Sequence, residues 1–287
     1  MPAVNFKAII EKVREIPPMP ESVVHLMEIP ESNRYFTEEF TAIIESDPSL
    51  TASIMKVANS AYTSQNREIT SVKDAVIILG RNLVISTAIR SFSSEFFDRD
   101  LPGYGQEGES LWKHSFATAI ASSVVARFGK GNISAETSFT AGIVHDIGKV
   151  LISEHMEDRV DVLLARLNKG ETSDYLAGER ELLGTDHCEI GGMLAENWNL
   201  PETFVESIRY HHHPSMAERH SREVVSAVHI GDTLAMMMGV STGCDCMRYR
   251  LDRTLTEALG ISPDDMGMLM AKVREKYRKR MEKFNWG

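Results

Sequence analysis

Hydrophobic residues recur every three or four positions along most of the chain, which is the spacing of one face of an α-helix. Short alternations of Val, Ile and Thr between turn residues, the pattern of half-buried strands, are almost absent. The pattern therefore predicts an all-α fold. In the helix expected after Pro48, the apolar face consists of Leu50, Ile54, Val57, Ala58 and Ala61.

Capping residues mark where several of these helices begin or end. Asp47 before a proline is typical of a helix start, because the carboxylate caps free amides and a first-turn proline lacks an N–H that would be unpaired. Ser71, with Asp74 three residues later, resembles a capping box, and Gly80 is placed to end the same helix. The string Ser262-Pro263-Asp264-Asp265 predicts the start of a last helix.

Two breaks in the pattern indicate how the chain is organised. Pro17-Pro18-Met19-Pro20 forces an extended segment between two helices. Residues 98–108 contain a proline, three glycines and several acids, and are typical of a linker or a long loop. We therefore expect a boundary near residue 100, between an N-terminal subdomain of short helices (1–100) and a C-terminal region of longer helices (101–287).

Composition narrows the class of protein. At 287 residues and 43% hydrophobic content the chain can build a sizeable core, and a formal charge of -10 argues against broad nucleic-acid binding. Cys188, Cys244 and Cys246 cannot form a disulfide framework, and no apolar leader opens the sequence. No apolar run approaches the roughly 20 residues that span a bilayer. We expect a cytoplasmic protein without membrane insertion.

Histidines are concentrated in one part of the sequence. Eight of the ten lie between His114 and His220. His145 and Asp146 sit in an apolar stretch where two adjacent ionisable groups are costly to bury without a partner such as a metal ion. Lys149, one turn beyond Asp146, is placed to contact an anion. The predicted metal ligands are His114, His145, Asp146, His187, His211, His212 and Asp232, with His229 as a spare candidate.

Simpler interpretations stand beside the metal site. The same residues are also compatible with a metal-free network of histidines and carboxylates. Cys244 and Cys246 make a poor metal site without further thiolates. The basic residues between Lys272 and Lys283 are typical of a solvated helix face.

The order of the ligand candidates resembles that of the HD superfamily of metal-dependent phosphohydrolases. The strings that carry this likeness hold His114, His145-Asp146 and Asp232 in the same order and context. The added His187 and His211-His212 resemble the fuller metal set of the HD-GYP cyclic-dinucleotide phosphodiesterases. The likeness implies one or two divalent ions, Fe, Mn or Zn, with Asp146 and Lys149 as the catalytic candidates.

The chain as a whole resembles most the HD-related output domain (HDOD) family of bacterial signalling proteins, over roughly residues 16 to 235. This likeness implies an N-terminal helical bundle packed on a C-terminal HD-like domain that carries a C-terminal helical extension. The motifs that carry it are Pro17-Pro18-Met19-Pro20, Asp47-Pro48-Ser49-Leu50, Val57-Ala58-Asn59-Ser60, Ile69-Thr70-Ser71, Ile78-Leu79-Gly80, Leu111-Trp112-Lys113-His114-Ser115, Ala141-Gly142-Ile143-Val144-His145-Asp146-Ile147-Gly148-Lys149, Trp198-Asn199-Leu200-Pro201 and Tyr210-His211-His212-His213-Pro214.

Two departures from these families bear on function. HDOD proteins are often described as lacking the HD metal residues, whereas this sequence keeps them. The segment His213-Pro214-Ser215-Met216 lacks the Gly-Tyr-Pro residues of HD-GYP enzymes, which argues against cyclic-dinucleotide hydrolysis. We expect a signalling output protein with a retained metal site, a protein partner and room for a nucleotide ligand. The first alternative is a metal-dependent phosphohydrolase or phosphodiesterase that acts on a nucleotide or cyclic dinucleotide, and the second is a di-iron redox sensor.

Overall fold

The computed structural model of the chain describes residues 6–30, 33, 35–62, 69–93, 97–105, 110–131, 133–250, 252, 255 and 259–284. These residues form α-helices and short 3-10 turns with no extended strand among them, so the predicted all-α fold is confirmed. The chain divides into two compact units. The bundle unit comprises Met19–Ser94 and Arg274–Gly287, and the site unit comprises Met1–Pro18 and Glu95–Val273.

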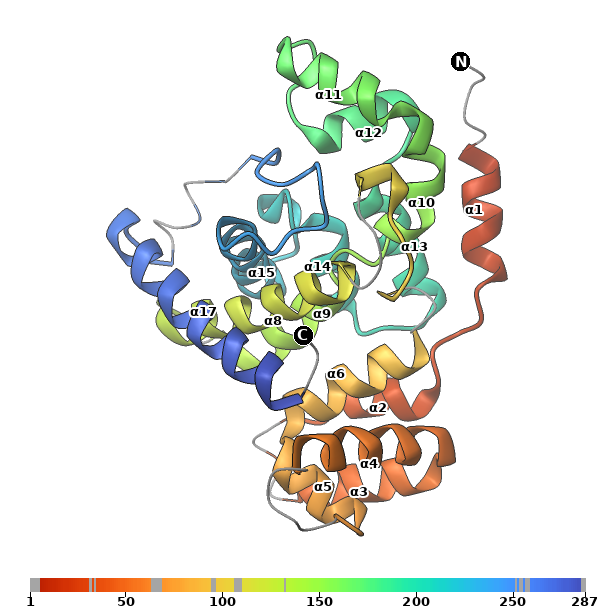
Figure 1. Ribbon diagram of the computed structural model, residues 1–287, viewed down its shortest axis with the longest axis vertical. Helices are drawn as coiled ribbons and strands as arrows, with labels where there is room; N and C mark the ends of the chain where they lie inside the picture. Colours follow the sequence, from red (N-terminus) through yellow and green to blue (C-terminus); the bar gives the residue numbers. More distant parts are fainter. Residues whose placement is uncertain are drawn as a thin grey trace. The chain divides into compact units, whose positions relative to one another are not determined.

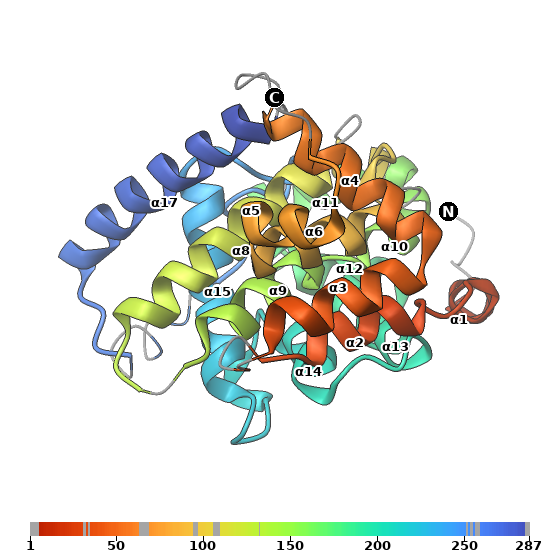
Figure 2. The same ribbon diagram turned by 90° about the horizontal axis from the view of Figure 1, so that it is seen from below.

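The bundle unit is built from short helices that pack pairwise around an apolar core. Helix α3 packs against α4 and α5, and α4 also packs against α6 (Figures 1 and 2). The helices are α2 (Glu21–Glu28), α3 (Phe36–Ser46), α4 (Pro48–Tyr62), α5 (Val72–Leu79) and α6 (Arg81–Phe92). The fully buried core side chains include Phe40, Ile44, Ile54, Ala58, Val76, Ile85 and Ile89.

The predicted caps of this unit are confirmed. Asp47 Oδ1 accepts hydrogen bonds from the backbone N–H groups of Ser49 and Leu50, both at 3.0 Å, at the start of α4. Ser71 Oγ accepts from the N–H of Asp74 at 3.1 Å at the start of α5. The chain turns between α5 and α6 at a glycine with φ +72°. Because an L side chain is strained there, glycine suits the sharp turn.

No single described helix is both long enough and apolar enough to cross a bilayer. Helices α5 and α6 reach that length and apolarity only as a pair, and the pair is bent by 110°.

The site unit contains the longer helices. Its elements are α1 (Phe6–Glu15), η2 (Pro102–Tyr104), α8 (Ser110–Phe128), α9 (Ala135–Val144), α10 (Lys149–Met156), η3 (Glu157–Arg159), α11 (Val160–Asn168), α12 (Tyr175–Leu183), α13 (His187–Asn197), α14 (Glu202–Tyr210), η4 (Pro214–Met216) and α15 (Arg222–Met237). Helix α17 (Pro263–Phe284) contributes residues to both units. Its predicted cap is confirmed, since Ser262 and Asp265 each accept a hydrogen bond from the other's backbone N–H.

Helix α8 is the main packing partner in the site unit and lies against both α9 and α15 (Figure 1). Glycines make both approaches close. A Cβ atom added to Gly142 of α9 would lie 2.6 Å from the Cα of Ala119, and one added to Gly231 of α15 would lie 2.7 Å from the backbone N of Ser122. These contacts draw three polar positions of the sequence together: His114 on α8, His145 after α9 and Asp232 on α15.

The N-terminal helix belongs to the site unit. Helix α1 packs against α10 and α13. The indole N–H of Trp198 donates to the carbonyl of Pro17, and the amide of Asn197 donates to the carbonyl of Ile16, both at 3.0 Å. The division of the sequence into residues 1–100 and 101–287 placed this helix in the other part, because periodicity does not indicate which neighbour covers an amphipathic face.

The segment expected to be a linker or long loop, residues 98–108, is described as far as residue 105. Leu101 and Tyr104 are fully buried, and η2 packs against α10. The backbone N–H of Gly103 donates to Ser153 Oγ at 3.0 Å. This part of the segment is therefore anchored in the core of the site unit. The positions after 105 lie outside the described residues.

Candidate metal centre

The seven residues predicted as metal ligands come together inside the site unit, and each is less than a tenth exposed. Five of them lie where helices begin or end, because backbone turns can point successive side chains inward at one place. His145 and Asp146 form the turn between α9 and α10, His187 begins α13, and His211 and His212 follow α14. His114 and Asp232 project from within α8 and α15.

Asp146 lies between two groups of histidines. Its Oδ2 atom is 3.4 Å from Nε2 of His114 and 3.4 Å from Nε2 of His145. Its Oδ1 atom is 3.5 Å from Nε2 of His187 and 3.5 Å from Nε2 of His211. Ligand atoms of one metal ion typically lie about 3 to 3.6 Å apart. One carboxylate is therefore placed to serve two adjacent ions, one at each oxygen.

The first half of the centre combines nitrogen and oxygen donors. Asp232 Oδ1 lies 3.1 Å from Nε2 of His114 and 3.9 Å from Nε2 of His145. The ligand atoms of these three residues all lie within 4.8 Å of one another. With Oδ2 of Asp146 they form a set of two imidazoles and two carboxylates, which suits Fe, Mn or Zn.

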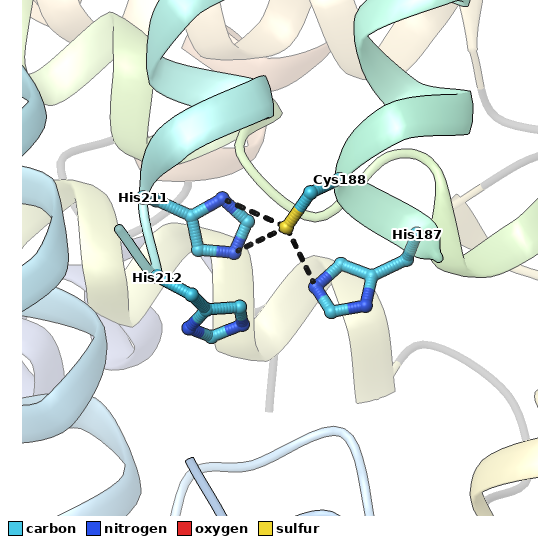
Figure 3. Close-up of side chains that lie close together, drawn as sticks. All are labelled: His187, Cys188, His211 and His212. Carbon is cyan, nitrogen blue, oxygen red and sulfur yellow. Dashed lines mark hydrogen bonds between the residues drawn. The ribbon is translucent and has the colours of Figure 1, made fainter. Parts of the chain in front are cut away.

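The second half lies on the other side of Asp146. His187, Cys188, His211 and His212 each offer one ligand atom, and these atoms all lie within 4.8 Å of one another. Figure 3 shows the thiol of Cys188 between the rings of His187 and His211, with His212 beside them. The side chains come from the start of α13 and the turn after α14, so tertiary packing of these two helices creates this half.

Hydrogen bonds behind the centre orient the histidine rings. The Nδ1–H groups of His114, His145 and His211 donate to the backbone carbonyls of Val240, Gly142 and Ile208, each at 2.9 Å. Nδ1 of His187 donates to Glu179 Oε2 at 2.7 Å. Since each Nδ1 is occupied, Nε2 of each ring faces the centre, and outer hydrogen bonds of this kind are typical of metal-binding histidines.

The spare candidate His229 has a different role. Its Nδ1–H donates to the carbonyl of His211 at 2.6 Å, and its Nε2 accepts from the backbone N–H of Asp252 at 3.0 Å. Both ring nitrogens are engaged, so His229 holds the backbone of a candidate ligand in place instead of facing an ion.

Several buried polar atoms of the centre have no hydrogen-bond partner among the described residues. They include Nε2 of His114, Nε2 of His145, Oδ1 of Asp146 and both ring nitrogens of His212. An unsatisfied buried polar group costs about 1–3 kcal/mol, and native proteins contain few of them. Divalent cations would satisfy the two Nε2 atoms, the carboxylate oxygen and one nitrogen of His212, and the residues therefore fit a metal ion on chemical grounds.

Electrostatics makes the centre strongly polarised when no ion is bound. Burial lowers the pKa of His114, but the carboxylates of Asp146 and Asp232 outweigh burial and raise it to about 10. Burial lowers the pKa of His145 to about 3, although the carboxylates of Asp146 and Asp232 oppose this shift. Burial raises the pKa of Asp232, but its histidine neighbours outweigh burial and lower it to about 2.

Lys149, predicted to contact an anion, is buried beside the centre. Its ammonium lies 2.7 Å from Asp146 Oδ2, and it donates to Thr242 Oγ1 at 2.9 Å and to Asp245 Oδ2 at 2.7 Å. Burial lowers its pKa, but the charges of Asp146 and Asp245 outweigh burial and raise the pKa above its usual value. The contact to an anion stays a prediction, and in this structure the three ammonium protons face protein oxygens.

The sequence did not single out four residues that complete the surroundings of the centre. Asp245 holds Lys149, Glu179 orients His187, and the ring of Tyr249 stacks on His212 with centroids 4.0 Å apart. Cys188 joins the second half. Its place directly after His187 was a local signal, whereas Glu179, Asp245 and Tyr249 have no spacing relation to the ligands.

Comparison with known proteins places this arrangement in a family. The HDOD domain model matches residues 16–214. An uncharacterized protein of Treponema pallidum (strain Nichols) is 23% identical over 225 residues, which cover 77% of this chain and 42% of that protein. The chain thus spans less than half the length of this curated relative.

Solved structures share the fold. An HDOD domain protein with unknown function from Geobacter sulfurreducens has a TM-score of 0.67 and 22% identity, and the match covers 96% of both chains. A candidate signal transduction protein of Marinobacter aquaeolei VT8 has a TM-score of 0.74 and 23% identity, covering 96% of this chain and 60% of that one. A candidate phosphohydrolase of Shewanella amazonensis SB2B has a TM-score of 0.64, 24% identity and 97% coverage of both chains. The family model covers most of this chain, which therefore belongs to the HDOD family.

Proposed function

We propose that this chain is a regulatory HDOD protein that holds two metal ions at an HD-type centre. One observation carries the proposal: the two oxygens of Asp146 face different histidine pairs, at 3.4 Å from His114 and His145 and 3.5 Å from His187 and His211. The ammonium of Lys149 pairs with Oδ2 of Asp146, but no lysine or arginine pairs with Oδ1 among the described residues, and a buried carboxylate oxygen without a partner is costly.

A regulatory role, as opposed to open catalysis, is favoured by what covers the centre. Residues 240–249 follow α15 and contact residues of the metal centre at several points. The carbonyl of Val240 accepts from His114, Asp245 holds Lys149, and Tyr249 stacks on His212. Asp245 is also almost fully buried. An enzyme needs an open coordination position and a free phosphate-binding group.

The proposed output is contact with a signalling protein, which is the partner expected for a member of the HDOD family. Metal occupancy would set the rigidity of the site unit. The ligand groups repel one another or stay unpaired without the ion, so the free energy of metal binding adds to the stability of the folded unit. The cytoplasmic location and a nucleotide ligand belong to the same proposal. A bound nucleotide would have to displace the carboxylate of Asp245 from Lys149.

The test is the metal content of the protein purified without a histidine tag or chelator. We expect two equivalents of Fe, Mn or Zn in the wild type and at most one in His145→Ala and Asp232→Ala. His220→Ala is the matched control, because the ring of His220 is exposed and pairs with Glu202 instead of a residue of the centre. This variant should keep both equivalents of metal. A wild type that takes up no ion when ions are supplied overturns the proposal. Bound iron that changes absorbance on reduction would instead favour the redox sensor.

Phosphohydrolase activity is the second candidate, and the position of Lys149 favours it. Its ammonium lies one turn from Asp146 and 2.7 Å from the carboxylate at the middle of the centre. Divalent ions, when bound, would lower the pKa of a water and hold a phosphate oxygen. Lys149 would then offset negative charge on the transferred group. The substrate class is a phosphate ester such as a nucleotide, and Asp245 must first release the ammonium.

Removal of the Asp245 charge tests this second candidate. Asp245→Asn should weaken the hold on Lys149 and, if the protein is a hydrolase, raise turnover of phosphate esters at least several-fold over the wild type. Asp161→Asn on the exposed face of α11 is the control and should change nothing. Equal absence of turnover in metal-loaded wild type and Asp245→Asn would reject hydrolysis.

A further inference from the structure

Cys188 is a donor of a different chemical kind from all the other groups at the centre. It is the second residue of α13 and only 2% exposed. Its Sγ atom lies 3.4 Å from Nε2 of His187 and 3.9 Å from each of the two ring nitrogens of His211 (Figure 3). A buried thiol is often a small apolar filler, but an apolar filler does not usually point at two imidazole nitrogens.

The distances agree with shared coordination of one ion. With metal–sulfur and metal–nitrogen bonds of about 2.3 and 2.05 Å, sulfur and nitrogen at two corners of a tetrahedron lie about 3.6 Å apart. The separation from Cys188 Sγ to His187 Nε2 is 3.4 Å and that to His211 Nε2 is 3.9 Å. Both are within a few tenths of an ångström of that value.

The same two histidine nitrogens are also at ligand distance from the central carboxylate. Oδ1 of Asp146 is 3.5 Å from Nε2 of His187 and 3.5 Å from Nε2 of His211. His187 and His211 are thus at ligand distance from both a sulfur donor and an oxygen donor. The ligand atoms of His187, Cys188, His211 and His212 all lie within 4.8 Å of one another, so these four residues form a candidate site for one ion.

We propose that the thiolate of Cys188 binds the ion held by His187 and His211, which makes the two halves of the centre chemically unequal. The half with Asp232 offers nitrogen and oxygen donors, and the half with Cys188 adds sulfur. This inference rests on the proposed function, because it requires that the centre holds ions. As the metal–sulfur bond forms, the thiol proton leaves to solvent and no atom changes oxidation state.

The sulfur donor predicts the class of metal. Thiolates select soft or borderline ions such as Zn over Mn, whereas carboxylate and imidazole sets accept both. The half that contains Cys188 should therefore prefer zinc, and the half that contains His114, His145 and Asp232 should accept manganese or iron as well. A protein loaded from a mixture of ions is expected to hold two different metals.

Cobalt titration of the metal-free 287-residue chain tests the inference. Cobalt bound by a thiolate shows a near-ultraviolet charge-transfer band that cobalt bound only by nitrogen and oxygen lacks. We expect this band in the wild type and in Cys246→Ser, whose thiol lies outside the centre. Cys188→Ser should lose the band and bind zinc at least about tenfold more weakly, since loss of even an outer partner costs that much. Its second cobalt equivalent should remain.

The outcomes separate this inference from the proposed function. If wild-type protein binds cobalt at the centre without the charge-transfer band, the sulfur ligand is rejected and the metal centre stands. If the band persists in Cys188→Ser, another thiol is responsible and the assignment is wrong. If no cobalt binds to the wild type at all, both proposals fail together. Because the wild-type spectrum is decisive, the test holds even if Cys188→Ser folds poorly.

Discussion

The two units of this chain treat buried charge in opposite ways. Among the described residues of the bundle unit, Arg81 is the only ionisable side chain classed as buried, and it donates to the backbone carbonyls of Ile29 and Met27. The site unit buries many more. They include His114, His145, Asp146, Lys149, Glu179, Asp186, His187, Glu206, His211, His212, His229, Asp232 and Asp245.

The difference shows which part of the molecule is optimised for folding alone. An apolar core stabilises by removing hydrocarbon from water and needs no partner from outside the chain. Around the centre three buried carboxylates, those of Asp146, Asp232 and Asp245, face one buried ammonium, that of Lys149, so further positive charge would stabilise them. We therefore expect the stability of the bundle unit to be independent of bound ions, and the stability of the site unit to depend on them. The predictions below test this contrast.

Removal of the central carboxylate should have the largest effect. Asp146→Ala deletes the group that faces both histidine pairs, so we expect both ions to be lost, whereas Asp232→Ala should lose one. Elemental analysis of the purified variants measures the result. Asp161→Ala serves as the control with an unchanged metal content. Retention of both ions in Asp146→Ala would show that the carboxylate does not join the two halves.

Chelation should destabilise the site unit and leave the bundle unit unchanged. An ion present at a thousand times its Kd stabilises the folded state by about 4 kcal/mol, and a chelator removes that contribution. Hydrogen exchange followed by mass spectrometry should show faster exchange in α8, α9 and α15 and constant exchange in α2 to α6. Equal acceleration in both units would contradict the contrast between them. Asp146→Ala should show no response to chelator.

Close packing in the site unit predicts a cost for one added methyl group. The Cβ of Gly231→Ala would lie 2.3 Å from Ser122 Oγ and 2.7 Å from its backbone N, so α15 must move away from α8. Overpacking of this kind costs about 1–3 kcal/mol, measured from the midpoint of urea unfolding. Metal affinity should fall too, because Asp232 is the next residue. Gly267→Ala on α17 meets no atom within 4 Å and should be neutral or stabilising.

The smallest effect is expected in the bundle unit and should depend on pH. Asp47→Ala removes the cap of α4, which should cost about 1 kcal/mol without changing the metal content. The hydrogen bond from the N–H of Leu50 lowers the pKa of Asp47 in the folded protein, and burial opposes this shift without cancelling it. The cap therefore contributes fully above the unfolded pKa of about 3.9 and is lost as pH falls through the lower folded value.

The control for this titration is Asp47→Asn, which keeps an oxygen acceptor without a charge. Its unfolding free energy, measured by urea titration between neutral and acidic pH, should lack the part of the acid dependence that Asp47 contributes. An identical acid dependence in wild type and Asp47→Asn would show that this carboxylate does not contribute.

Local signals in the sequence predicted much of the secondary structure. Asp47, Ser71 and Ser262 cap the helices that they were expected to begin, because a cap depends only on atoms a few residues apart. The division into units was harder to predict. Helix α1 joined the site unit because α10 and α13 cover its apolar face, and such a contact leaves no trace in periodicity.

The sequence by itself determined the helical fold, the caps and the seven polar residues that the structure brings together. Those residues stand out because an ionisable group within an apolar stretch is costly to bury unless it has a partner. Only the tertiary structure decided which oxygen of Asp146 faces which histidines, that Asp245 holds Lys149, and that Cys188 joins the second half. These relations depend on distances of a few ångströms between helices far apart along the chain. Close packing sets those distances, and no local pattern encodes them.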